Sequence, residues 1–573
     1  MRGYLRNERG RVALLALLII LGIFFEIANP QLVQMFIDEA QADAKYATLV
    51  GLAATFVGLA VVRQIMAVGA AVLGESVGWT ATNALRGDLA AHVLGLDMAF
   101  HNSTSPGALN ERIDGDVTNL ATFFTQMVIK VIGNGLLMIG VLIAVARVDA
   151  RVGLAIGAFA LITLAVLVRV RTWGIPYQVA NRARSAEFAG FIGERLSGTE
   201  DIRALGAVNH TMWQLDTLLR AWYPHNWRSR MVFLVTFFVT VLLFGVGITV
   251  ALWVGSSLWQ AGLISIGTVY LIFSYTEMLR RPVNEIRQQV EDLQRASASI
   301  TRVRDLFVLK PAINDDQARP PGPSVPSAPS VAFCNVTFAY EDDAPVLHDV
   351  SFELPGGATL GLLGRTGSGK TTVARLLTRL YEPKHGDILL AGDSMRHLPL
   401  TVLRQRVGLV TQDVQLFNAS VRENVTLFDD RISDDAIMGG LSGLELGEWL
   451  TRLPDGLETR LKSGGAGISA GEAQLLAFAR MFLRAPGLVI LDEASSRLDP
   501  ATERLLDVAT ARLLQNRTGI IIAHRLATVQ RCDYILILDH GRVLEFGRRL
   551  DLALNPASNF YSLLRADLHE VLA

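Results

Sequence analysis

Residues 364–371 read Gly-Arg-Thr-Gly-Ser-Gly-Lys-Thr. This spacing matches the pattern G-x-x-x-x-G-K-[ST] of a phosphate-binding loop, which lies between a strand and a helix. The flanking sequence meets that requirement, because residues 358–363 form an apolar run typical of a strand and residues 372–380 are typical of a helix. A plain glycine turn is the alternative interpretation, and this context disfavours it.

Each part of the loop has an expected task. The backbone N–H groups of residues 367–372 are expected at a helix N-terminus, where unpaired donors and the helix dipole attract phosphate. Lys370 supplies a positive charge and the Thr371 hydroxyl a ligand for Mg²⁺. The predicted nucleotide-binding residues of this segment are Gly364, Arg365, Thr366, Gly367, Ser368, Gly369, Lys370, Thr371 and Thr372.

Two carboxylates and a histidine follow apolar runs further along the chain. Residues 487–491 are apolar and end in Asp492 and Glu493. A buried strand with two carboxylates at its end predicts Asp492 as a Mg²⁺ ligand and Glu493 as the group that orients or deprotonates the attacking water. His524 follows the apolar run 519–523, where it could contact the γ-phosphate. A structural role is the alternative for this histidine.

The composition requires a part of the chain to lie in lipid. Hydrophobic residues make up 51% of the 573 residues, and the mean hydropathy is +0.35. Apolar windows long enough to cross about 30 Å of hydrocarbon predict six transmembrane helices. The last window is the weakest, with only about 17 residues before Arg280 and Arg281, so five spans remain the alternative. The windows are 12–35, 47–73, 123–146, 152–170, 231–256 and 263–281.

Charge sets the expected orientation of these spans. Residues 169–230 hold nine Arg against five acidic residues, whereas residues 36–46 hold three acidic residues and one Lys. The positive-inside rule therefore places the N-terminus, the connection 169–230 and the C-terminal part in the cytoplasm. The first apolar run is too long for a signal peptide and lacks a cleavage site, so we expect an uncleaved span in a prokaryotic plasma membrane.

The cytoplasmic connections have the sequence composition that is typical of long helices. No proline interrupts residues 75–100, so the second span is predicted to continue as one rod through Phe100, roughly 35–40 Å beyond the bilayer. Breaks predict two elbows, at 102–110 and 196–204. An elbow can be a mere loop, but paired elbows far from the membrane are well placed to touch an ATPase domain.

Charged residues inside the apolar windows are costly in lipid. The notable examples are Glu26, Arg63, Lys130 and Glu277. Substrate contact and mutual pairing between helices are both open for Glu26 and Arg63. For Lys130, pairing or snorkelling at a span end is favoured.

Net charge and cysteine content exclude other classes. The net charge of −1 gives no basic excess, so no nucleic-acid partner is expected. Cys334 and Cys532 lack metal-ligand spacing and predict buried, reduced thiols in a cytosolic domain.

A proline-rich linker marks the domain boundary. Residues 310–330 contain six prolines, which predicts a membrane domain at 1–309 and an α/β P-loop ATPase domain at 331–573. Residues 331–340 alternate as a strand and end in Tyr340, which could stack on adenine. A half-buried tyrosine at a strand end is the alternative.

With these motifs in this order, the chain resembles an ABC transporter half of the exporter fold, over essentially its whole length. The resemblance implies that Tyr340 stacks on adenine and that Gln412 joins the Mg²⁺ ion, takes part in catalysis and faces the elbows. It also implies that Asp499 lies in a loop at the subunit interface and that the elbows act as coupling helices. ATP would lie between the phosphate loop of one subunit and the signature segment of the other.

The signature segment departs from the family pattern Leu-Ser-Gly-Gly-Gln. Residues 468–472 read Ile-Ser-Ala-Gly-Glu, so the trans-acting residues would be Ser469, Ala470, Gly471 and Glu472. Locally, Ser469 and Glu472 form a capping box for the next helix, which is also the non-functional interpretation. A carboxylate here competes with the γ-phosphate for the positive helix end, and the Ala470 methyl crowds the approach. We therefore predict a weakened signature. Residues 462–467 also lack the glutamate-containing loop of many exporters.

These features predict an ATP-hydrolysing transporter subunit that exports a small molecule, lipid or peptide. An intact Glu493 beside an altered signature favours one half of a heterodimer, with a homodimer as the alternative. An exporter-fold importer of metal chelates and a non-transporting ATP-gated regulator are further alternatives. The transported substrate is left open.

Overall fold

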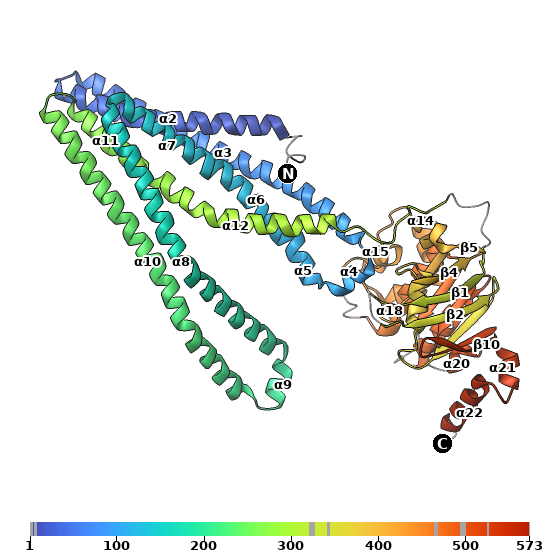
Figure 1. Ribbon diagram of the computed structural model, residues 1–573. Helices are drawn as coiled ribbons and strands as arrows, with labels where there is room; N and C mark the ends of the chain where they lie inside the picture. Colours follow the sequence, from blue (N-terminus) through green and yellow to red (C-terminus); the bar gives the residue numbers. More distant parts are fainter. Residues whose placement is uncertain are drawn as a thin grey trace. The chain divides into compact units, whose positions relative to one another are not determined.

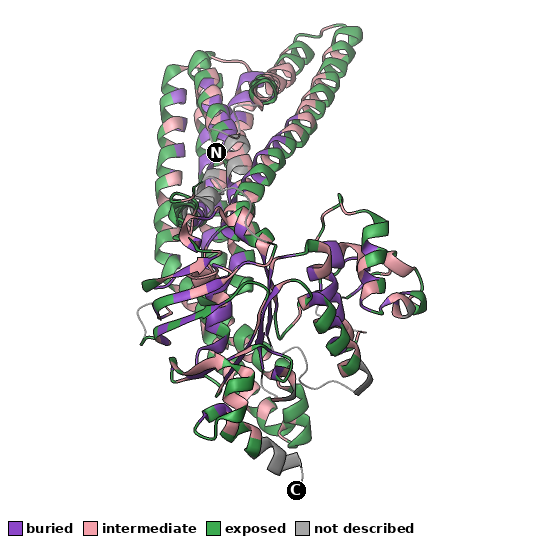
Figure 2. Ribbon diagram, turned by 90° about the vertical axis from the view of Figure 1, so that its right-hand side faces the viewer, coloured by how far each residue is buried: buried purple, intermediate pink, exposed green. Residues whose placement is uncertain are grey.

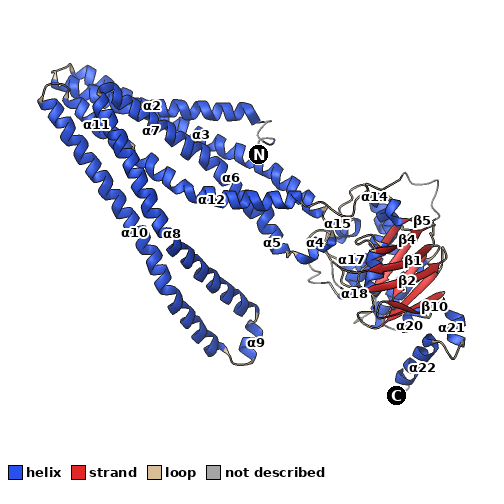
Figure 3. Ribbon diagram, in the orientation of Figure 1, coloured by secondary structure: helices blue, strands red, loops and turns tan. Residues whose placement is uncertain are grey.

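The computed structural model describes residues 4, 8–319, 327–340, 344–462, 468–492, 500–523 and 526–571. The chain divides into two compact units. We call the first, Met1–Leu94 with Pro106–Leu309, the membrane unit. The second, Gly95–Ser105 with Lys310–Ala573, is the C-terminal unit. All described strands belong to the C-terminal unit (Figure 3).

The membrane unit consists of long helices joined by short turns (Figure 1). The first five apolar windows lie within these helices, as the sequence predicted, and the last, 263–281, begins three residues before α11. The helices in chain order are α2 (Arg9–Gln41), α3 (Tyr46–Leu94), α5 (Pro106–Asn110), η2 (Glu111–Asp116), α6 (Val117–Gln126), η3 (Met127–Ile132), α7 (Gly133–Val148), α8 (Ala150–Ser197), α9 (Thr199–Ala204), α10 (Val208–Gln260), α11 (Ile266–Met278) and α12 (Arg280–Val308).

Five helical segments of the described chain are long and apolar enough to cross a membrane: Arg9–Gln41, Tyr46–Leu94, Lys130–Val148, Ala150–Ser197 and Val208–Gln260. The sixth predicted span begins with α11, which has only 13 residues. Leu279 separates α11 from α12 and keeps an α-helical conformation, so the rod continues. Near the start of α11, the carboxylate of Asp38 accepts hydrogen bonds from Ser265 Oγ at 2.8 Å and Gly267 N at 2.9 Å, which joins α11 to α2.

Many large apolar residues of the membrane unit are exposed, and exposed positions recur along its long helices (Figure 2). On α10, Phe233, Phe237 and Trp253 are each more than half exposed. Long helices satisfy their own backbone groups, so such surfaces are stable in hydrocarbon and would be unfavourable in water. The burial pattern therefore agrees with helices that face lipid.

The predicted rod after the second span is shorter than expected. Helix α3 ends at Leu94, six residues before Phe100, so the expectation of one rod to that residue was wrong. Gly95 weakens the helix there, and Asp97 adopts an extended conformation as the N-cap of α4 (Met98–Ser103). The second elbow contains the short helix α9 (Thr199–Ala204), within the predicted break.

The four ionisable residues that the sequence singled out inside the apolar windows each form an ion pair. Arg63 lies 3.6 Å from the carboxylate of Glu26, and Lys130 lies 3.5 Å from Glu285. Glu277 pairs with Arg280 at 3.0 Å. The structure thus contains mutual pairing of these residues, and contact with a substrate stays a prediction for Glu26 and Arg63.

The C-terminal unit holds two sheets. One has the order β2-β1-β4-β5 and the other the order β10-β9-β3-β8-β7-β6. The strands are β1 (Val331–Phe338), β2 (Leu347–Leu354), β3 (Thr359–Gly364), β4 (His385–Leu390), β5 (Asp393–Ser394), β6 (Val407–Val410), β7 (Leu488–Asp492), β8 (Thr518–Ile522), β9 (Tyr534–Asp539) and β10 (Arg542–Arg548).

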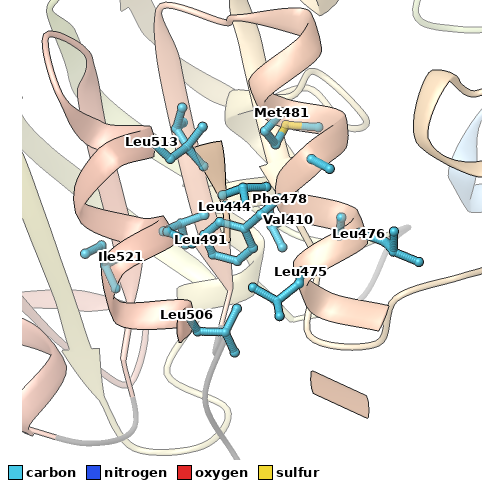
Figure 4. Close-up of a cluster of buried hydrophobic side chains, with 14 of the residues drawn as sticks. Val410, Leu444, Leu475, Leu476, Phe478, Met481, Leu491, Leu506, Leu513 and Ile521 are labelled. Atoms are coloured by element: carbon cyan, nitrogen blue, oxygen red, sulfur yellow. The ribbon is translucent and has the colours of Figure 1, made fainter. Parts of the chain in front are cut away.

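Helices α13, α14 and α18 pack against strands of the six-stranded sheet. The helices of this unit after the linker are α13 (Lys370–Leu377), η4 (Met395–His397), α14 (Leu400–Arg406), α15 (Val421–Thr426), α16 (Asp434–Gly443), α17 (Gly447–Arg452), η5 (Gly456–Glu458), α18 (Ala470–Arg484), α19 (Pro500–Leu514), α20 (Leu526–Val529), α21 (Arg549–Leu554) and α22 (Asn559–Val571). Phe478 of α18 is fully buried in one core, beside Leu491 of β7 (Figure 4). Both cysteines are free. Cys532 is buried, which raises the pKa of its thiol to about 12, whereas Cys334 is exposed, contrary to expectation.

A buried carboxylate holds the end of the membrane unit together. Asp116, at the end of the π-helical turn η2, is 1% exposed. It accepts hydrogen bonds from Ser299 Oγ at 2.8 Å and Arg302 Nε at 2.7 Å, both from α12. Burial alone would raise the pKa of Asp116, but the hydrogen bonds from Arg302 and Ser299 outweigh it and hold the pKa below its ordinary value. The carboxylate is therefore ionised at neutral pH.

Replacing Arg302 by Met is expected to destabilise the membrane unit by about 2 kcal/mol, because it removes the charged donor of a buried carboxylate. Arg304→Met is the matched control, since Arg304 is largely exposed and, among the residues that the structure describes, pairs only with the exposed Asp305. Thermal unfolding of both variants in lipid nanodiscs measures the difference. Equal midpoints for the two variants would contradict this role of Asp116.

Candidate functional site

Four parallel strands bring their carboxyl ends to one edge of the six-stranded sheet. Strand β8 pairs with β3 on one side and β7 on the other, so Ile522 lies opposite both Leu362 and Asp492. Strand β6 pairs with β7, with Val410 opposite Leu491. Because the four strands run parallel and end within a few residues of one another, the residues that follow them must lie at one edge. Ligands bind at such edges in open α/β sheets.

The loop after β3 has a backbone that only glycine adopts readily. Gly364, Gly367 and Gly369 have φ angles of 148°, 84° and 101°. A Cβ atom on Gly364 would lie 2.2 Å from the carbonyl oxygen of Leu538 and 2.6 Å from Ser368 Oγ. The loop therefore passes so close to strand β9 that no larger residue fits at its first position.

The loop presents polar groups to its interior. The Lys370 ammonium donates to the carbonyl oxygens of Gly364 at 2.7 Å and Arg365 at 3.0 Å, and the residue is 5% exposed. The buried Ser368 hydroxyl has no hydrogen-bond partner in the described chain. A buried cation and an unsatisfied hydroxyl beside the first turn of α13 fit a phosphate group, which would accept from both.

The neighbouring strand ends supply oxygen atoms. Asp492 is the last residue of β7 and is 8% exposed. Gln412 lies two residues after β6, and Thr371 in the first turn of α13; both are exposed. Carboxylate, amide and hydroxyl oxygens are donors that suit Mg²⁺, which completes its shell with phosphate and water. Glu493, Asp499 and His524 lie outside the described residues.

Tyr340 follows β1 and is held from several sides. Its hydroxyl is 3.0 Å from Thr372 Oγ1 and accepts from Arg375 Nη1 at 3.1 Å. The guanidinium of Arg375 also lies 5.8 Å from the centre of the Tyr340 ring. The rings of Phe338 and Tyr381 pack edge-on against Tyr340 at 4.8 and 5.0 Å. The ring orientation is thus fixed before any ligand binds.

Sequence reasoning missed Arg375 and Tyr381. Arg375 could have been found, because it lies three residues after Thr372 and therefore on the same face of α13. Tyr381 carries no local signal, since only the fold brings it beside Tyr340.

The segment 468–472 forms the predicted capping box at the start of α18. Glu472 N donates to Ser469 Oγ at 3.2 Å, and Ser469 N donates to Glu472 Oε2 at 2.8 Å. In addition, Ser469 Oγ lies 2.9 Å from the same carboxylate oxygen, to which its hydroxyl donates. The hydroxyl hydrogen of Ser469 is therefore already used in a hydrogen bond to the Glu472 carboxylate. Ala470 is exposed and Gly471 buried.

Sequence comparison identifies the class. Residues 12–283 match the family described as ABC transporter transmembrane region, and residues 347–496 match the family described as ABC transporter. The chain belongs to the ABC transporters and carries their membrane region and ATP-binding domain in one polypeptide. Its ATP-binding domain implies ATPase activity coupled to transport.

Individual relatives cover most of the chain. A fatty acid ABC transporter ATP-binding/permease protein of Mycobacterium bovis is 30% identical over 84% of this chain and 76% of its own. An ATP-dependent lipid A-core flippase of Chromobacterium violaceum is 30% identical over 81% and 79%. The mitochondrial iron–sulfur clusters transporter of Homo sapiens is 28% identical over 95% and 73%.

A solved structure confirms the exporter fold. The structure of a bacterial Atm1-family ABC exporter with ATP bound matches with a TM-score of 0.79 and 25% sequence identity. The match covers 97% of this chain and 98% of that chain. The prediction of a helical membrane domain joined to an α/β P-loop ATPase domain is thus confirmed.

Gly364→Ala is expected to weaken ATP binding at least about tenfold, since the added methyl group would collide with the Leu538 carbonyl and displace the loop. Gly392→Ala is the control: Gly392 has a φ of 87°, but its Cβ would meet open space. Equilibrium binding of ATP to both variants tests this. Similar losses in the two variants would show that backbone strain, not the close approach, is responsible.

Proposed function

We propose that this chain is the subunit of an ATP-driven exporter for a small molecule, lipid or peptide, and that it is cytoplasmic at its C-terminal unit in a prokaryotic plasma membrane. The main observation behind this proposal is that one polypeptide combines helices long enough to span a membrane with a nucleotide site. That site consists of a phosphate loop and of Asp492, which ends strand β7 at the same edge of the sheet. Relatives named for fatty acid and lipid A-core transport support a lipid-like substrate.

In this proposal ATP and Mg²⁺ occupy the edge of the six-stranded sheet. Tyr340 stacks on adenine, and the phosphate loop with Lys370 binds the phosphates. Thr371, Gln412 and Asp492 hold Mg²⁺. Glu493 orients or deprotonates the attacking water, and His524 contacts the γ-phosphate. Asp499 lies at the subunit interface, and residues 469–472 face the nucleotide of the other subunit.

We further propose that the second subunit is a different half-transporter. The supporting observation is the hydrogen bond from the Ser469 hydroxyl to the Glu472 carboxylate. A hydroxyl that donates to its own chain is not available to the γ-phosphate across the interface, and the carboxylate repels that phosphate. Hydrolysis at Glu493 would then use the partner's intact signature.

The ATPase activity of this chain purified alone in lipid nanodiscs tests the arrangement. We expect no turnover above a Glu493→Gln control in well-folded protein, because both sites would contain the weak signature. Copurification of a second, different half-transporter from the native host would complete the case. Robust turnover that Glu493→Gln abolishes would instead establish a homodimer.

Glu472→Gln is expected to give the chain alone a turnover at least about tenfold above the Glu493→Gln background, since Gln keeps the helix cap but removes the negative charge. Glu423→Gln is a matched control. Glu423 forms the same capping box with Ser420 at the start of α15, outside the signature segment. ATP hydrolysis of the three proteins gives the comparison. Unchanged turnover in Glu472→Gln would show that the Glu472 carboxylate is not the cause of a weak signature.

A further inference from the structure

The segment Gly95–Ser105 belongs to the C-terminal unit although it lies between α3 and α5 in sequence. Asp97 accepts hydrogen bonds from the backbone N–H groups of Ala312 at 2.6 Å and Ile313 at 3.3 Å. The segment is therefore fixed to the start of the linker region. Its two ends continue covalently into helices of the membrane unit. A movement of those helices is therefore transmitted to this segment.

One side chain of the same segment contacts a group of three aromatic residues, Phe338, Tyr340 and Tyr381. Asn102 Nδ2 donates to the hydroxyl of Tyr381 at 2.7 Å. The ring of Tyr381 meets the ring of Tyr340 edge-on, with 5.0 Å between centroids and an interplanar angle of 88°. Both rings also contact Phe338 edge-on. One hydrogen bond and one aromatic contact thus separate the elbow from Tyr340.

The surroundings of Tyr381 hold its backbone still. The neighbouring Arg379 is 5% exposed and donates to Glu382 Oε1 at 2.8 Å and to the carbonyl oxygens of Leu398 at 3.0 Å and Asn314 at 3.2 Å. With the backbone held, the remaining freedom of Tyr381 lies in its side chain. The Asn102 hydrogen bond acts on the outer end of that side chain.

We propose that Tyr381 is a positioning residue that couples the elbow at Asn102 to the adenine-facing ring of Tyr340. When the elbow holds the Tyr381 hydroxyl, the Tyr381 ring supports Tyr340 in the orientation that receives adenine. Withdrawal of the elbow releases this support and weakens adenine stacking, while the phosphate loop is unaffected. This inference rests on the proposed stacking of adenine on Tyr340.

Thermodynamic linkage gives the coupling two directions. If the docked elbow strengthens ATP binding by some factor, bound ATP must strengthen elbow docking by the same factor. Binding of the adenine base, and not only of the phosphates, would then influence the position of the elbow and of the membrane helices joined to it.

The test uses equilibrium binding to the full chain in lipid nanodiscs, with two probes: Mg-ATP, and pyrophosphate, which carries no base. A Glu493→Gln background prevents hydrolysis. We expect Asn102→Ala and Tyr381→Phe each to raise the Kd for ATP about threefold, the effect of one neutral hydrogen bond. The double variant should show no further loss, since both substitutions remove the same contact. Pyrophosphate binding should stay unchanged, which also verifies that each variant is folded.

Ser103→Ala is the matched control in the elbow. Within the described part of the chain, the Ser103 hydroxyl donates only to Phe100 O, in its own turn, so this variant should bind ATP as the parent does. Tyr381→Leu, which removes the ring itself, should raise the Kd for ATP about tenfold. Unchanged ATP affinity in Asn102→Ala, a ninefold loss in the double variant, or an equal loss for pyrophosphate would each overturn the proposal. Failure of the parent chain to bind ATP would instead refute the proposed function.

Discussion

Everything at the candidate site depends on the parallel register of β3, β8, β7 and β6. Strands β7 and β8 are buried along their whole length, so their alignment is fixed by apolar packing on both faces. A shift of one residue would turn every side chain to the opposite face. The same register that buries Leu491 therefore also sets the level of Asp492 beside the phosphate loop. Chemistry at this edge is a consequence of core packing.

The sequence was sufficient for the features that repeat locally. Apolar runs predicted the buried strands, because a fully buried strand shows no alternation, and the phosphate-loop spacing located Gly364 to Lys370. The capping box at Ser469 also followed from spacing alone, since it involves residues three apart. These predictions share a cause: each concerns a contact within one element or between elements joined by a short turn.

Contacts between distant segments were beyond the sequence. Nothing near Asn102 indicates Tyr381, 279 residues later, and nothing near Asp116 indicates Arg302. The π-helical turns η2 and η3 left no mark in the apolar pattern, since one extra residue per turn barely changes composition. Helix α3 ended early because Gly95 and Asp97 together stop a helix that neither proline nor polarity interrupts. That signal was present but weaker than the apolar texture around it.

The Ser469–Glu472 pair shows how the residue three positions after a capping serine can be glutamate without loss of the helix cap. A capping box needs only an acceptor three residues after the serine, so glutamine and glutamate are equivalent for starting α18. The two residues differ in how they interact with an anion outside the helix. The amide can leave the serine hydroxyl to another acceptor, whereas the carboxylate is both a stronger acceptor and a negative charge. Stability therefore does not oppose this substitution, and its consequence falls on whatever the helix N-terminus must bind. In an assembly with two composite sites, that consequence is confined to the one site that this segment completes, which makes a division of labour between two unlike sites physically accessible through one side chain.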